Sequence, residues 1–229
     1  MSPFQKDERF FTKDWTITLP SRPEPNLKFI RLTPNETAEF KRFVEEADSS
    51  PAAKSSNTEP SPVELKASFD SGDRMQKMYV ESQTQHHAFD VFISLDDKFV
   101  GSGAIYEITP PFSKLSVANI GIKLHPEVQG KGLGKTLMQL LLRLSNEVDA
   151  DIIEAGTMKE NASMRAMAKS VGLVESDKIK FVPGRGVVAD VMFENIERER
   201  WRDFEMVVEF REKVVELQVS QLNTPLLDN

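Results

Sequence analysis

The sequence predicts an α/β domain with a central mixed sheet, and three observations favour this class. Short apolar segments typical of strands alternate with segments whose apolar residues recur at helical spacing. Two of the strand segments flank the turn residues 96–98 and predict a β-hairpin. The 229 residues are 39% hydrophobic and 28% charged, which is the composition of a globular protein.

The first part of the chain contains few regular patterns. Residues 1–28 mix aromatic and charged side chains with four prolines, so we expect an irregular N-terminal arm. A short strand over 29–33 and a helix to about Ala47 follow. Residues 48–62 hold eight Ser or Pro residues and no large apolar side chain. We therefore expect a flexible insertion over 48–72.

The remainder of the chain carries stronger patterns. Residues 132–148 place leucines at 3.6-residue spacing and predict a long amphipathic helix. The charged segment 197–219 predicts a last helix, which either packs on the domain or forms a contact in a homodimer. We expect a main domain over 29–195 and a C-terminal helix and tail over 196–229. The other expected elements are helices near 73–82 and over 161–171, and strands over 89–95, 99–106, 116–124, 151–157, 179–182 and 187–193.

Composition excludes several functional classes. A formal net charge of −7 argues against broad binding to nucleic acid or to an anionic membrane, because a phosphate-rich surface would be repelled. Without cysteine the chain has no thiolate nucleophile and no cysteine-ligated metal. The three histidines lack metal-ligand spacing, so no metal site is expected. No apolar run approaches the roughly 18–20 residues of a membrane span. We expect a cytoplasmic protein.

The run QGKGLGKT at residues 129–136 has the composition of a phosphate-binding loop. As a nucleotide P-loop it would need glycine at position 129, which is Gln129, and no strand leads directly into it. As a dinucleotide fingerprint its glycine spacing is one residue short. It can also be a glycine-rich turn with solvated lysines. One more interpretation depends on the segments before and after the run.

The segment Gln129-Gly130-Lys131-Gly132-Leu133-Gly134 resembles the (Q/R)xxGx(G/A) pyrophosphate loop of the GNAT acetyltransferase superfamily. The similarity extends through IGIKLHPEVQGKGLGKTLMQLLL, the preceding hairpin and the segment that ends in KSVGL, and covers about residues 29–195. It implies a GNAT fold, whose mostly antiparallel sheet has a splayed fourth and fifth strand and helices on both faces. It also implies acetyl-CoA as cosubstrate and an amine-bearing acceptor, which is a small molecule or a protein.

The physical chemistry of the loop agrees with a bound pyrophosphate. Glycines let the backbone approach a diphosphate closely, and the amide groups at the positive end of the following helix face the anion. Lys131 and Lys135 add positive charge. None of these features requires Mg²⁺, which suits coenzyme A because its pyrophosphate is bound and not cleaved.

The resemblance assigns further cofactor-binding residues. The strand before the loop would offer backbone N–H groups of Ile122 and Leu124, with Lys123 between them, and one N–H would polarise the thioester carbonyl. Asn161 would cap the helix that follows it and contact the arm of the cofactor. The same residues also fit ordinary core-strand and helix-cap roles.

The catalytic groups are less clearly marked. An amine attacks only in its neutral form, so a base or a water chain must remove a proton. Glu107 and Glu154 are the candidate bases, and Asn119 is a candidate to order a water. The family often places a tyrosine acid where this chain has Ala168. The predicted function is therefore an N-acetyltransferase, with a non-catalytic acyl-CoA-binding sensor as the alternative.

Overall fold

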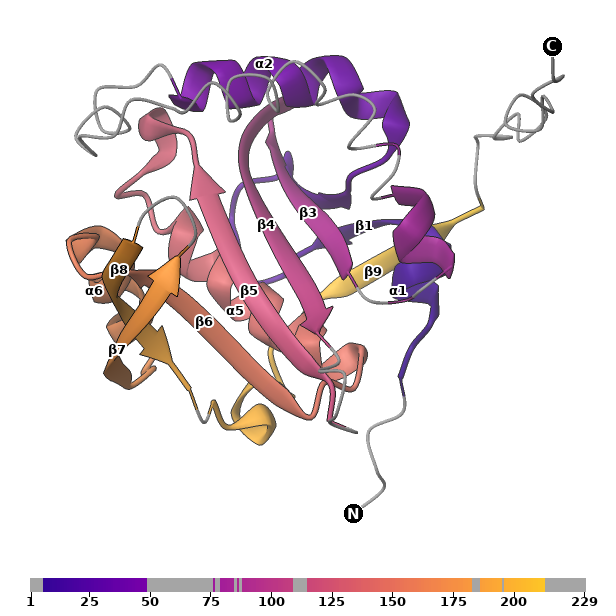
Figure 1. Ribbon diagram of the computed structural model, residues 1–229. Coiled ribbons are helices and arrows are strands. Elements are labelled where there is room, and N and C mark those ends of the chain that lie inside the picture. The colour runs from indigo at the N-terminus through magenta and orange to yellow at the C-terminus, as the bar shows by residue number, and fades with distance from the viewer. Residues whose placement is uncertain are drawn as a thin grey trace, which may run out of the picture.

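The computed structural model describes residues 6–48, 76, 79–84, 86, 88–108, 115–182, 186–194 and 196–212. Within these residues nine strands form one sheet in the order β7-β8-β6-β5-β4-β3-β2-β1-β9 (Figure 1). All neighbours pair antiparallel except β5 and β6, which are parallel. The strands are β1 (Asp14–Thr18), β2 (Leu27–Arg31), β3 (Ala88–Leu95), β4 (Lys98–Ile108), β5 (Val117–Leu124), β6 (Ile152–Met158), β7 (Glu175–Val182), β8 (Gly186–Phe193) and β9 (Val207–Arg211).

Helices cover both faces of this sheet. Val91 and Ile93 of β3 belong to the main core, whereas Phe92 packs against Phe43 in a second cluster. Because successive side chains of a strand point to opposite faces, the two clusters lie on opposite sides. The mixed, mostly antiparallel sheet confirms the predicted α/β class. The helices are α1 (Arg9–Thr12), α2 (Thr37–Asp48), α5 (Leu133–Glu147) and α6 (Ala162–Ser170), with 3₁₀ turns at Pro34–Glu36, Pro126–Val128 and Arg198–Trp201.

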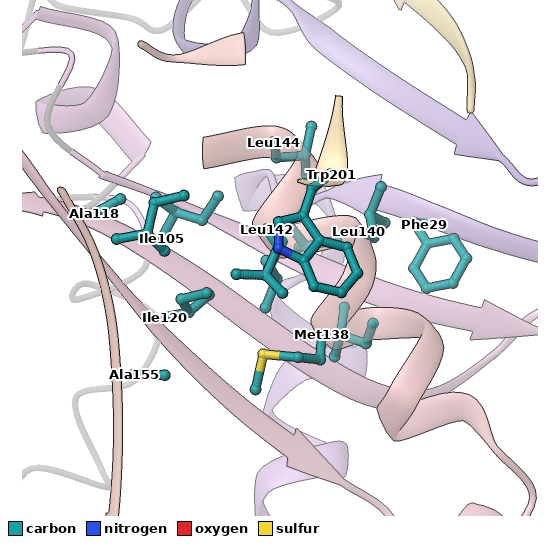
Figure 2. Packing of buried hydrophobic residues seen from close by; sticks show 14 of the residues in the cluster. Phe29, Ile105, Ala118, Ile120, Met138, Leu140, Leu142, Leu144, Ala155 and Trp201 are labelled. Atoms are coloured by element: carbon teal, nitrogen blue, oxygen red, sulfur yellow. The ribbon is translucent and has the colours of Figure 1, made fainter. Parts of the chain in front are cut away.

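The long helix α5 forms the centre of the main core. The sheet covers one side of it, and Trp201 packs against it from outside the sheet (Figure 2). Leu140 and Leu144 are fully buried, and so is Leu142, which stands between them on another side of the helix. Burial on more than one side explains why leucine is so frequent here. The helix predicted over 132–148 is confirmed.

The expectation of an irregular arm over 1–28 is wrong for much of its length. After α1, strand β1 pairs with β2 on one side and with β9 on the other. Trp15 and Ile17 are 1% and 0% exposed, and both belong to the main core. Alternation of apolar and polar residues in DWTIT was the signal for a strand. The nearby prolines lie outside β1 and do not interrupt it.

The predicted helix over 197–219 is also wrong for its described part. A 3₁₀ turn at Arg198–Trp201 is followed by β9, in which Val208 and Phe210 pack on the core while Glu209 is exposed. This alternation has the period of a strand. Residues after 212 lie outside the described part of the chain, as does most of the expected insertion over 48–72. Of the expected helix near 73–82, the described residues 79–84 are helical.

Substitution of a buried residue of β1 tests whether this N-terminal strand belongs to the core. We expect Ile17→Ala to lower the free energy of unfolding by about 2–5 kcal/mol, because it removes buried methyl groups and leaves a cavity. Urea unfolding measures the change. Val207→Ala is the matched control, because Val207 lies on the adjacent strand and is 56% exposed. Equal small effects of the two substitutions would contradict the described packing of β1.

A second set of contacts joins α6 to the edge strand β7. Glu175 accepts hydrogen bonds from Arg165 Nη2 at 2.7 Å and pairs with Lys169 Nζ at 2.8 Å. The bond from Arg165 is the main reason, followed by that from Lys169, that the pKa of Glu175 falls to about 2. The carboxylate therefore ties two successive elements together.

We expect this clamp to stabilise the fold at neutral pH and to be lost in acid. A carboxyl group whose folded pKa lies below its ordinary value of 4.5 contributes stability above pH 4.5, and loses it as the pH falls towards 2. Melting temperatures measured between pH 2 and 5 should therefore fall less steeply for Glu175→Gln than for the unmodified protein. Asp177→Asn, on the same strand and 71% exposed, is the control. Parallel profiles for all three proteins would refute the clamp.

Candidate functional site

The sheet opens between its two parallel strands. β5 and β6 pair from Val117 opposite Ile152 as far as Ile120 opposite Ala155. Beyond that point β5 is paired with β4 and β6 with β8. Figure 1 shows the two strands diverging towards their carboxyl ends. The predicted splay of these strands is therefore present, and within the described ranges no strand pairs with the second side of residues 121–124.

Backbone direction decides which amide groups face this opening. The N–H of His125 donates to Val100 O of β4 at 2.9 Å. Because backbone groups of successive strand residues point to opposite sides, those of Leu124 and Ile122 face away from β4. Gln129 supports this orientation, since its Nε2 donates to Leu124 O at 3.2 Å. The side chain of Gln129 thus fixes the end of β5, and Lys123 is exposed between the two predicted donors.

The glycine loop requires its glycines for two different reasons. Gly130 and Gly132 have φ values of 73° and 82°, in the left-handed region that favours glycine. Gly134 is helical, but a Cβ atom there would lie 3.0 Å from both Leu124 Cδ1 and Met167 Sδ. The absence of a side chain at Gly134 therefore lets the start of α5 pack closely on β5 and α6.

The N-terminal end of α5 is open to an anion. Gly132 is the N-cap and offers no side-chain cap, and the first turn contains no acidic residue. The first amide groups of a helix have no partner within it, and they carry its partial positive charge. Leu133 is buried, whereas Lys131 and Lys135 are exposed on either side of it. This geometry suits a phosphate group.

One basic residue at this end was not singled out from the sequence. Arg22, in the connection between β1 and β2, has its Nη1 atom 3.5 Å from Thr136 Oγ1. The same atom lies 3.6 Å from the position that a Cβ of Gly132 would take. Arg22 is 114 residues from Thr136 in sequence, and no spacing pattern indicates that the two meet.

The helix α6 borders the site through its first residue. Asn161 is exposed, and its Oδ1 accepts a hydrogen bond from the N–H of Met164 at 3.1 Å. Asn161 therefore caps α6 as predicted, and the rest of its amide lies at the surface. Ala168 on the same helix is fully buried in the main core. This position supplies no proton donor.

Two of the three candidate catalytic residues lie side by side. Asn119 of β5 is directly opposite Glu154 of β6, one pair before the strands separate. Both side chains are half-buried. Tyr106 of β4 takes the register position opposite Asn119. Glu107 does not share this row, because it pairs with Ala118, and its side chain lies outside the described part of the structure.

Other features of the described residues do not contribute to this site. A cavity of about 500 Å³ lies near the opposite end of α5, where Phe10, Arg143, Glu147 and Phe204 help to line it. None of the predicted site residues borders that cavity. No cluster of three or more His, Asp or Glu residues suited to a metal ion is found among the described residues. No helix in the described ranges has the length and apolar character needed to cross a bilayer.

Comparison with solved structures identifies relatives of the fold. RimJ from Mycobacterium smegmatis, in complex with CoA-disulfide, has a TM-score of 0.60 at 20% identity, over 85% of this chain and 90% of that one. The ribosomal-protein-S5-alanine acetyltransferase from Vibrio fischeri has a TM-score of 0.58 at 16% identity, over 79% and 96%. The microcin C7 self immunity acetyltransferase MccE, with acetyl-CoA and AMP, gives 0.59 at 14% identity, over 77% and 98%. These likenesses confirm the fold.

Comparison at the level of sequence identifies the family. No curated protein sequence matches the chain. The family model described as "Acetyltransferase (GNAT) family" matches residues 55–173, more than half of the 229 residues. The matched range includes the splayed ends of β5 and β6, the glycine loop and Asn161. The chain therefore belongs to the GNAT acetyltransferase family.

Proposed function

We propose that this acetyltransferase transfers an acetyl group from acetyl-CoA directly to the amine of a small molecule or protein. One observation carries the proposal: the opening between β5 and β6 adjoins the uncapped N-terminus of α5. An extended thioester arm would lie in the opening, and a pyrophosphate would lie at the helix end. Two of the structural relatives, RimJ and MccE, are solved with CoA-disulfide and acetyl-CoA respectively. We expect the protein to act in the cytoplasm.

The cofactor would be held mainly by backbone groups. Amide groups of residues 130–135 would bind the pyrophosphate, with Lys131 and Lys135 adding charge. The pantetheine arm would pair with the backbone of Ile122 and Leu124, whose N–H groups face the opening. Gln129 would hold the loop in place through its bond to Leu124 O. Asn161 would contact the arm from the start of α6.

The chemistry follows from the position of the thioester. A backbone N–H of β5 would donate to the thioester carbonyl oxygen and stabilise the charge that develops on it. The neutral amine attacks the carbonyl carbon, a C–N bond forms, and the C–S bond breaks. The thiolate that leaves takes up a proton from water. Glu154 would accept the proton lost by the amine, through a water that Asn119 holds.

The homodimer contact expected from a C-terminal helix loses its basis. Residues 207–211 form β9, which is paired with β1 in the same sheet. The acceptor is an amine whose pocket we expect residues 48–77 and 183–186 to frame. Residues 49–75 and 183–185 of these segments lie outside the described part of the chain.

Turnover on a panel of amines tests the proposed function. We expect acetyl-CoA to raise the melting temperature while Mg-ATP does not, because only a ligand of the folded state stabilises it. We then expect free CoA to be released when polyamines, amino acids, aminoglycosides or peptides with free N-termini are added. Stabilisation by acetyl-CoA without acetylation of any amine would favour the sensor instead, which the alanine at position 168 supports. Absence of stabilisation by acetyl-CoA would refute both.

Substitution of Glu154 tests the proposed base. On an amine that is turned over, we expect Glu154→Gln to lower kcat on the order of 10²-fold or more, because the proton acceptor is removed. Glu209→Gln, an exposed carboxylate on β9, is the control and should leave kcat unchanged. A mainly structural Glu154 would instead give a lower melting temperature with little change in the pH profile of kcat.

A further inference from the structure

The N-terminal segment brings one arginine to the end of α5, outside the range that the family model matches. Arg22 is held by Glu24, whose carboxylate accepts from Nε at 3.0 Å and from Nη2. The third nitrogen, Nη1, points to the loop. Its hydrogen-bond partner among the described residues is Thr136 Oγ1, at a long 3.5 Å. The edge of the guanidinium that carries Nε and Nη2 is therefore fixed by Glu24, while Nη1 can still donate further hydrogen bonds.

Electrostatics makes this position unusual for a cation. The N-terminus of a helix carries partial positive charge, so a guanidinium beside it is repelled unless an anion is bound there. Lys131 and Lys135 add to the positive charge, and the first turn of α5 holds no acidic residue. Glu24 offsets part of the charge from the far side of Arg22. A bound diphosphate would convert the whole arrangement from repulsive to attractive.

We propose that Arg22 is a cofactor-binding residue and that its Nη1 donates to the pyrophosphate of acetyl-CoA. The inference rests on the proposed function, because the diphosphate is the one that the glycine loop would hold. The pyrophosphate is favoured over the 3′-phosphate because Nη1 lies against Gly132 and Thr136, in the loop and first turn themselves. Glu24 is the positioning residue that holds the guanidinium at the correct angle.

The test is the affinity of the Arg22→Gln variant for CoA and for 3′-dephospho-CoA, measured by calorimetry. We expect about a tenfold weaker Kd for both ligands, which corresponds to the loss of one charge-assisted hydrogen bond. A loss with CoA alone would assign Arg22 to the 3′-phosphate and overturn the proposal. Unchanged affinity for both ligands would also overturn it. Failure of the unmodified protein to bind CoA would instead refute the proposed function.

Controls separate binding from support of the fold. Arg9→Gln is the matched control, because Arg9 pairs with a carboxylate two residues away, as Arg22 does, but lies near the other end of α5. It should leave both affinities unchanged.

Thr136→Val removes the hydrogen bond to Arg22 and keeps the positive charge of the arginine. If Thr136→Val weakens CoA as much as Arg22→Gln, the arginine only braces the helix. Should Arg22→Gln fail to fold, Arg22→Lys keeps the charge, and an unchanged Kd in that variant would contradict a directed donor.

Discussion

The separation of β5 from β6 after Ile120 and Ala155 is the constraint on which the site depends. Each strand is held by its outer neighbour, β5 by β4 and β6 by β8, so neither can bend back to pair. The start of α5 lies close to the opening, where a Cβ atom at Gly134 would be 3.0 Å from Leu124 Cδ1 and from Met167 Sδ. Leu124 O is already bonded to Gln129, whereas the N–H groups of Ile122 and Leu124 face the opening, where water or a ligand can accept from them. A site for an extended polar chain is thus a consequence of how the sheet is paired.

The N-terminal segment links this site to the stability of the whole domain. At one end of α5, the N–H of Asp7 donates to Glu147 O at 2.8 Å. At the other end, Arg22 lies beside Gly132 and Thr136. Between these points the segment adds β1 to the sheet. Contacts at both ends hold α5 against the sheet, so the position of its N-terminus depends on residues well outside the glycine loop.

Local patterns predicted the parts of the fold that local contacts determine. The leucine periodicity of α5, the hairpin of β3 and β4, and the loop from Gln129 to Gly134 each lie within one short stretch, and the structure contains all three. The pairing of β1 with β9 places Trp15 opposite Phe210, which is 195 residues away in the sequence. No local pattern in either segment indicates which strand it pairs with. For the same reason the sequence could not show that Glu154 lies opposite Asn119 whereas Glu107 lies opposite Ala118. Register between strands is set by tertiary packing.

Recognition through backbone groups also accounts for a fold retained at low sequence identity. The proposed contacts to the donor use the amides of Ile122, Leu124 and the glycine loop, while the side chains of Leu133 and Leu137 fill the core. A side chain there can change without altering the amide, provided that the strand and the loop keep their course. Structures 14–20% identical to this chain accordingly share its fold. Selection of the acceptor must depend instead on side chains, because amines differ in shape and charge beyond the nitrogen that reacts. One donor site can therefore be kept by the fold while different side chains select different amines.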